Sequence, residues 1–152
     1  MENNQKTIDT LNELVEINNE RTAGYDQAYR TTEETNMKTL FSKLAESSKQ
    51  YREELATEVK KLGGKPRETT VVSGKPYRVW TDIKTALNKK DPKAILNSFE
   101  SGEDYTVSAY ENALNTTALK PEVQTIVKKQ VGLIKAEHTK VKDLRNNVTK
   151  TM

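Results

Sequence analysis

The 152-residue sequence contains no cysteine, one tryptophan, six glycines and four prolines. The lack of cysteine excludes disulfide scaffolds, thiol catalysis and cysteine-ligated zinc. No run approaches the roughly 18 apolar residues that a membrane-spanning helix needs, and the first residues lack the basic-then-apolar pattern of a signal peptide. We therefore expect a cytoplasmic protein with no membrane segment, folded as a single domain over residues 1–152.

The few glycines and prolines lie at the ends of long periodic stretches. Residues 5–62 contain no proline and only one glycine, and turn signals follow at Gly63-Gly64, Ser73-Gly74, Asp91-Pro92 and Pro121. Paired glycine after a periodic run ends a helix, and proline in a first turn begins one. Between these signals, apolar residues recur at steps of three and four, as on one face of a helix. The pattern predicts helices over about residues 7–33, 36–62, 92–117 and 121–148.

The connections between these helices differ in length. Residues 63–91 form a long crossover, in which Val79, Trp80, Ile83 and Leu87 predict a short amphipathic helix over about residues 76–88. The other two connections are only a few residues long, which makes the helices that they join antiparallel. One long crossover between two helical hairpins is the ferritin-like arrangement. The expected fold is all-α: an antiparallel four-helix bundle of ferritin-like type, with a short fifth helix in the crossover.

Polar residues interrupt the apolar seam of each helix near its middle. Asn18, Ser48, Glu103 and Glu137 hold these positions, one in each long helix. Buried polar groups cost free energy unless they are paired, so four at similar depth have to satisfy one another. We expect Glu103 to be a buried carboxylate paired with Lys49, Lys135 or Asn18. The predicted buried polar layer comprises Asn18, Ser48, Lys49, Glu103, Lys135 and Glu137. Three tyrosines on the same seams supply hydroxyl groups: Tyr25, Tyr51 and Tyr110.

Four stretches carry a resemblance to a known family. These are LNELVEINNERTAGY at 11–25, SGKPYRVWTDIKTAL at 73–87, AILNSFESGEDYTVSAYENAL at 94–114 and QVGLIKAEH at 130–138. Together they resemble a bacterial ferritin-like four-helix-bundle family of unknown function. That family has no established biochemical activity, so the resemblance implies the fold and suggests a stress-related role as a hypothesis.

The wider ferritin-like class binds two metal ions, using a Glu from each of two helices and a Glu-x-x-His motif from each of the others. Here Asn18 stands at the first-helix position. Residues 46–49 have Lys in place of the His, and residues 135–138 have Lys in place of the Glu. A degenerate site for iron or another divalent ion would use Glu103, Glu137, His138 and Glu46. Because a single His supports a transition-metal site weakly, pairing of these groups within the protein is the favoured interpretation.

The sequence contains none of the common motifs of other enzyme activities. No phosphate-binding loop, nucleophile elbow or His-Glu-x-x-His motif occurs. The stretch from Lys60 to Lys90 is basic and contains Tyr77, Arg78 and Trp80, but a net charge of +3 does not predict a nucleic-acid partner. The sequence favours an uncharacterised, non-catalytic bundle protein without a cofactor, and the alternative is the metal-binding bundle. The hypothesis is that the protein associates with itself, as a homodimer, or with a protein partner whose identity the sequence does not reveal.

Overall fold

The computed structural model describes residues 2–67, 86–88, 91–116 and 119–151, and these residues form helices and their connections with no β-strand. The prediction of an all-α helical bundle is confirmed. The long helices are α1 (Glu2–Thr31), α2 (Thr35–Lys61), α4 (Pro92–Thr116) and α5 (Pro121–Thr151). In this described part of the chain, none of the helices combines the length and the apolar character that crossing a bilayer requires.

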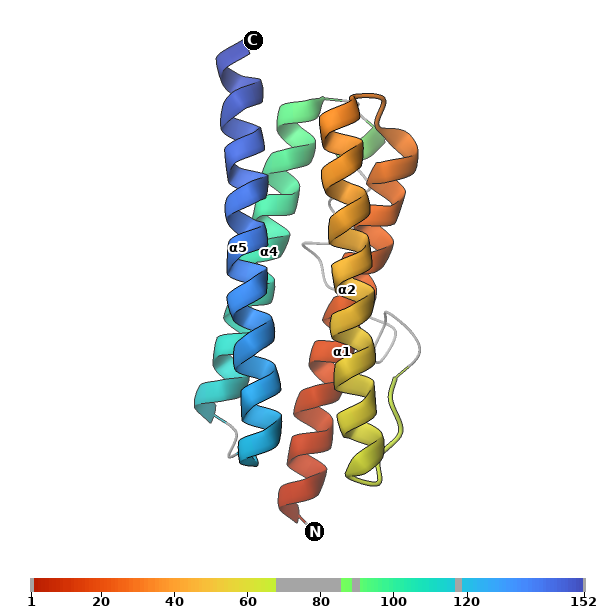
Figure 1. The fold of residues 1–152 in the computed structure, drawn as a ribbon, viewed down its shortest axis with the longest axis vertical. Helices are drawn as coiled ribbons and strands as arrows, with labels where there is room; N and C mark the ends of the chain where they lie inside the picture. Colours follow the sequence, from red (N-terminus) through yellow and green to blue (C-terminus); the bar gives the residue numbers. More distant parts are fainter. Residues whose placement is uncertain (1, 68–85, 89–90, 117–118, 152) are drawn as a thin grey trace.

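The four helices form two antiparallel hairpins that lie side by side (Figure 1). Helix α1 packs most extensively on α2, and α4 packs most extensively on α5. Helix α2 also lies beside α5, and α1 lies beside α4. Helix α2 ends at one end of the bundle, and α4 begins at the other end and runs in the same direction as α2. Every neighbouring pair of helices is therefore antiparallel.

The helix ends follow local capping chemistry. The carboxylate of Glu34 accepts hydrogen bonds from the backbone N–H groups of Asn36 and Met37, at 3.0 and 2.8 Å, so α2 begins at Thr35. Helix α1 begins at Glu2, which is earlier than the predicted start at residue 7. Most of the short helix predicted over residues 76–88, with Trp80, Tyr77 and Arg78, lies outside the described residues. The last three residues of that segment, 86–88, are helical.

The first residues of the crossover are attached to α1. The side-chain amide of Asn12 donates to the carbonyl oxygen of Lys65, and its oxygen accepts from the N–H of Arg67, both at 3.1 Å. The Arg67 guanidinium also donates to the buried carboxylate of Glu16 at 3.2 Å. This segment of the chain therefore packs against Asn12 and Glu16 of α1.

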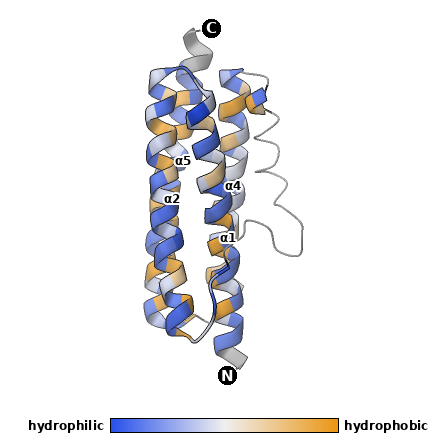
Figure 2. Cartoon of the chain, turned by 90° about the vertical axis from the view of Figure 1, so that its right-hand side faces the viewer, coloured by the Kyte–Doolittle hydropathy of each residue, from blue (hydrophilic) through white to orange (hydrophobic). Residues whose placement is uncertain are grey.

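The amphipathic helices, whose hydrophobic and hydrophilic residues alternate along each ribbon (Figure 2), enclose a core that is divided in two. One hydrophobic cluster joins the first half of α1 to the second half of α2 and includes Leu11, Leu55 and Val127. The other includes Tyr25, Phe41 and Phe99, and the rings of Tyr25 and Phe99 stack with centroids 4.4 Å apart. On every helix, the residues between the two clusters include a buried polar side chain. The fold thus places a polar layer between two hydrophobic ones.

Two glycines have opposite conformational requirements and provide a test of the helix assignments. Gly63 follows α2 with φ +86°, whereas a Cβ atom added to Gly132 on α5 would have no atom within 4 Å. We expect Gly132→Ala to raise the free energy of unfolding by roughly 0.5–1 kcal/mol, because alanine restricts the unfolded chain. We expect Gly63→Ala to lower it by about 1–2 kcal/mol, because alanine disfavours positive φ. Urea denaturation measures the free energy of unfolding of both variants. If the two substitutions changed it in the same direction, the placement of Gly63 after α2 and of Gly132 within α5 would be contradicted.

Candidate functional site

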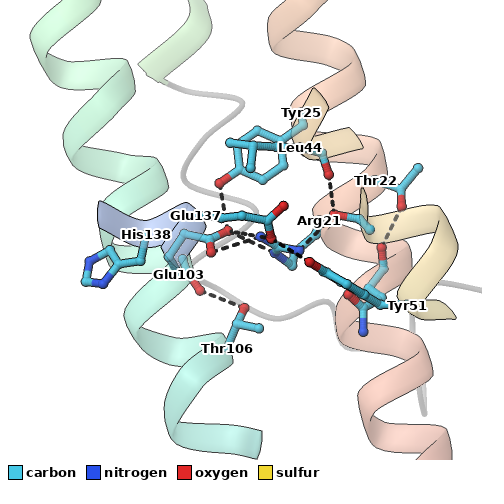
Figure 3. A network of polar contacts seen from close by, with 12 residues as sticks. Arg21, Thr22, Tyr25, Leu44, Tyr51, Glu103, Thr106, Glu137 and His138 are labelled. Carbon is cyan, nitrogen blue, oxygen red and sulfur yellow. Dashed lines mark hydrogen bonds and ion pairs between the residues drawn. The ribbon is translucent and has the colours of Figure 1, made fainter. Parts of the chain in front are cut away.

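The polar layer is built around the side chain of Arg21, which is completely buried. Its Nε and Nη2 atoms donate to the two carboxylate oxygens of Glu103 at 2.8 and 2.9 Å (Figure 3). This two-point contact matches the planar fork of the guanidinium and joins α1 to α4.

The same guanidinium reaches the other two helices. Nη1 donates to the hydroxyl oxygen of Ser48 on α2 at 3.0 Å, and Nη2 lies 3.5 Å from a carboxylate oxygen of Glu137 on α5. The Ser48 hydroxyl in turn donates to the carbonyl oxygen of Leu44 at 2.7 Å. One side chain from α1 therefore contacts all three of the other long helices.

Two tyrosines complete the shell of the carboxylates. The hydroxyl of Tyr25 donates to Glu103 at 2.7 Å, and the hydroxyl of Tyr51 donates to Glu137 at 3.0 Å. The guanidinium carbon of Arg21 also lies 5.6 and 5.8 Å from the centres of these two rings. At such distances the aromatic faces attract the cation. Each tyrosine therefore stabilises a carboxylate through its hydroxyl and the Arg21 guanidinium through its ring.

A second set of hydrogen bonds continues the layer toward the hydrophobic cluster that contains Leu11. The amide of Asn18 donates to the hydroxyl of Tyr110 at 2.8 Å, and that hydroxyl donates to the side-chain oxygen of Gln130 at 2.7 Å. The amide nitrogen of Gln130 donates to the carbonyl oxygen of Tyr51 and to Glu54, both at 3.1 Å. Within the described residues, the buried Oδ1 atom of Asn18 has no hydrogen-bond partner.

Burial sets the protonation behaviour of the layer. Burial raises the pKa of Glu103 above its ordinary value, while Arg21 and the hydroxyl of Tyr25 oppose that rise. Burial by itself lowers the pKa of Arg21, but the carboxylates of Glu103 and Glu137 more than compensate, and the net shift is upward. The guanidinium is therefore a permanent positive charge beside two carboxyl groups. Burial also raises the pKa of Tyr25, Tyr51 and Tyr110.

The structure places the residues of the predicted polar layer in two groups. Ser48, Glu103 and Glu137 surround Arg21, and Asn18 lies on the adjoining Tyr110 hydrogen bond. The placement of two lysines in this layer is wrong: Lys49 and Lys135 are exposed, and the Lys135 ammonium lies 3.6 Å from Glu111 on the surface. Successive residues of a helix are turned by about 100°, so the neighbour of an inward-facing Ser48 faces outward.

The four residues named as metal ligands do not meet. Glu103 and Glu137 share Arg21, but Glu46 is exposed, and His138 points away from the layer toward Asp104, at 3.1 Å (Figure 3). Adjacent helix positions again explain why His138 and Glu137 diverge. In the part of the chain that the structure describes, no group of three or more His, Asp or Glu side chains is arranged to hold a metal ion.

Sequence reasoning missed Arg21 itself. A charged residue is rarely buried completely, so an arginine in a helix does not by itself predict an inward-facing position. The available signal is spacing, because Arg21 lies three residues after Asn18 and four residues before Tyr25, which is the rhythm of an inward-facing stripe.

The fold and the site together define a class of protein: an all-helical bundle whose hydrophobic core is crossed by a layer of buried charged and polar side chains. A family model matches residues 6–116, most of the chain, and the chain belongs to that family, which is described as Domain of unknown function (DUF2383). The matched range holds Arg21, Ser48 and Glu103 and ends before α5 with Glu137. No curated protein was found to match the sequence.

Replacement of Arg21 by methionine removes the charge and retains a long side chain. We expect the free energy of unfolding to fall by about 3–5 kcal/mol near neutral pH, because a buried carboxylate then lacks its cation. Without Arg21, the pKa of Glu103 in the folded state rises further above its ordinary value of 4.5. Stability from a raised folded pKa is fully present below the unfolded pKa and is lost as the pH rises through the folded pKa. The destabilisation by Arg21→Met therefore shrinks toward acid pH.

Urea denaturation of both proteins at a series of pH values measures this dependence. Lys135→Met, which removes a charge from the surface, is the matched control and has little effect. A loss of stability that is the same at every pH would show that Arg21 does not compensate the charge of Glu103.

The buried tyrosines give a second test of the layer. Of the six tyrosines in the sequence, Tyr25, Tyr51 and Tyr110 have their pKa raised by burial. We expect these three to stay protonated until alkali unfolds the bundle, and each replacement by phenylalanine to remove one late-titrating group. Phenolate absorbance and circular dichroism, recorded on one alkaline titration, measure ionisation and unfolding together. Ionisation of all six while the protein remains helical would contradict the arrangement.

Proposed function

We propose that this chain is a non-catalytic bundle of ferritin-like connectivity that acts through association with itself or with another protein. The observation that carries the proposal is the contact of the Arg21 guanidinium with both Glu103 and Glu137 in the bundle core. Two helical hairpins lie side by side, and α4 begins at the opposite end of the bundle from the end of α2, which supports the ferritin-like connectivity.

The chemistry of the core supports a role without a metal. Where ferritin-like proteins bind metal, core carboxylates surround the ions. Here a guanidinium supplies the positive charge, and it has neither an exchangeable ligand position nor a second oxidation state. Its five N–H groups are donors only, so it cannot act as a base at neutral pH.

The closure of the site supports a role without catalysis. Arg21 and Glu103 are completely buried, and the hydrogen bonds described above engage them with each other and with side chains of the same layer. Catalysis requires that polar groups meet a substrate, whereas these groups meet only the protein. We therefore place the function on the outer surface of the helices. A stress-related role stays a hypothesis.

Metal content separates this proposal from the metal-binding alternative. We expect protein purified from cells supplied with iron and zinc to hold far less than one metal ion per chain. We expect Glu46→Ala and His138→Ala, which alter side chains outside the core, to leave that content unchanged. Elemental analysis after gel filtration makes the measurement. One ion per chain that is lost on replacing His138, with circular dichroism unchanged, would overturn the proposal in favour of a metal site.

A further inference from the structure

The two hairpins leave a groove between α2 and α5. The groove holds two neighbouring cavities of about 310 and 460 Å³, and Glu46 and Gln50 line both. Glu137 lines the first cavity and Tyr51 lines the second, so the floor of the groove is an edge of the polar layer. The side chain of Glu137 is 12% exposed, whereas those of Arg21 and Glu103 are completely buried.

Opposite charges from α2 and α5 line each cavity of the groove. Glu46 on α2 and Lys140 on α5 line the first cavity, and Glu54 on α2 and Lys129 on α5 line the second. The edge of α2 also carries Lys43, Lys49 and Glu53, so it is slightly acidic. The edge of α5 carries Lys129 and Lys140 against Glu137, so it is slightly basic. Each edge thus complements the other.

Leu133 adds an apolar contact at the same place. Its exposed fraction is 45%, and it is one of two large hydrophobic residues exposed among the described residues. It borders the cavity of about 460 Å³ beside Tyr51. A leucine from outside the chain would occupy part of that cavity and remove apolar surface from water.

We propose that two copies of this chain associate through the α2/α5 face about a two-fold axis parallel to the bundle. Such an axis keeps heights unchanged and lays α2 of one copy over α5 of the other. Glu46 then meets the partner's Lys140, and Glu54 meets the partner's Lys129, with the same two contacts repeated by symmetry. Leu133 of each copy enters the other copy's cavity. This inference rests on the proposed function, since it identifies one partner for the association.

The test measures the mass of the full chain by light scattering over a series of concentrations. We expect a dimer that dissociates on dilution, with a dissociation constant that rises with salt concentration. The variant Lys129→Glu/Lys140→Glu makes both edges acidic, and Glu46→Lys/Glu54→Lys makes both basic. We expect each variant to raise the dissociation constant by more than about tenfold, because attractive contacts become repulsive. An equimolar mixture of the two variants restores a dimer, since each acidic edge again meets a basic one.

The control is Lys128→Glu/Lys142→Glu, which makes the same change of charge on exposed positions of α5 that do not line the groove. We expect this variant to dimerise as the unaltered chain does. A dimer that neither groove variant weakens would overturn the proposed face, and a monomer at every concentration would overturn self-association. Neither result would affect the proposal of a metal-free bundle, which the metal content tests separately.

Discussion

A guanidinium that is wholly removed from water has to be met by acceptors and opposite charge within the protein, and this requirement organises the bundle. Arg21 meets it with Glu103 on α4, Ser48 on α2 and Glu137 on α5. Desolvation of such a group costs several kcal/mol, which only close contacts with ionised and polar partners offset. The four helices therefore have to bring these groups to one level. The hydroxyls of Tyr25 and Tyr51 each donate a further hydrogen bond to these carboxylates, to Glu103 and to Glu137 respectively.

The polar layer gives the core a register that its hydrophobic clusters do not specify by themselves. Leucine, valine and isoleucine tolerate a shift of one helix against another, since apolar contacts have little direction. A shift of one helical turn, about 5.4 Å, would carry Glu103 away from Arg21 and leave both charges buried without a partner. The charge pairing in the polar layer thus sets the register of the helices, and the hydrophobic clusters above and below it supply the packing. A single polar position plays a comparable part in coiled coils.

The pairing of charges in the polar layer leaves few of its polar groups in contact with solvent. The charged groups of the core are engaged with one another, and Glu137 and Tyr51 of this layer border the α2/α5 groove. The family match covers the helices that contribute Arg21, Ser48 and Glu103, and it ends before α5. The pair Arg21–Glu103 therefore belongs to the part of the chain that defines the family, and the contact with Glu137 is made by the helix beyond it.

Much of the fold followed from the sequence, because helix ends and inward-facing positions depend on neighbouring residues. Glycine, proline and the steps of three and four predicted four long helices, and they marked Ser48, Glu103 and Glu137 as polar residues on apolar seams. The sequence did not determine which cation joins them. Lys49 and Lys135 lie on the surface, whereas Arg21 occupies the centre. Periodicity specifies the direction of a side chain about its own helix, but a hydrogen bond of 2.8 Å depends on how separate helices are rotated and aligned against one another.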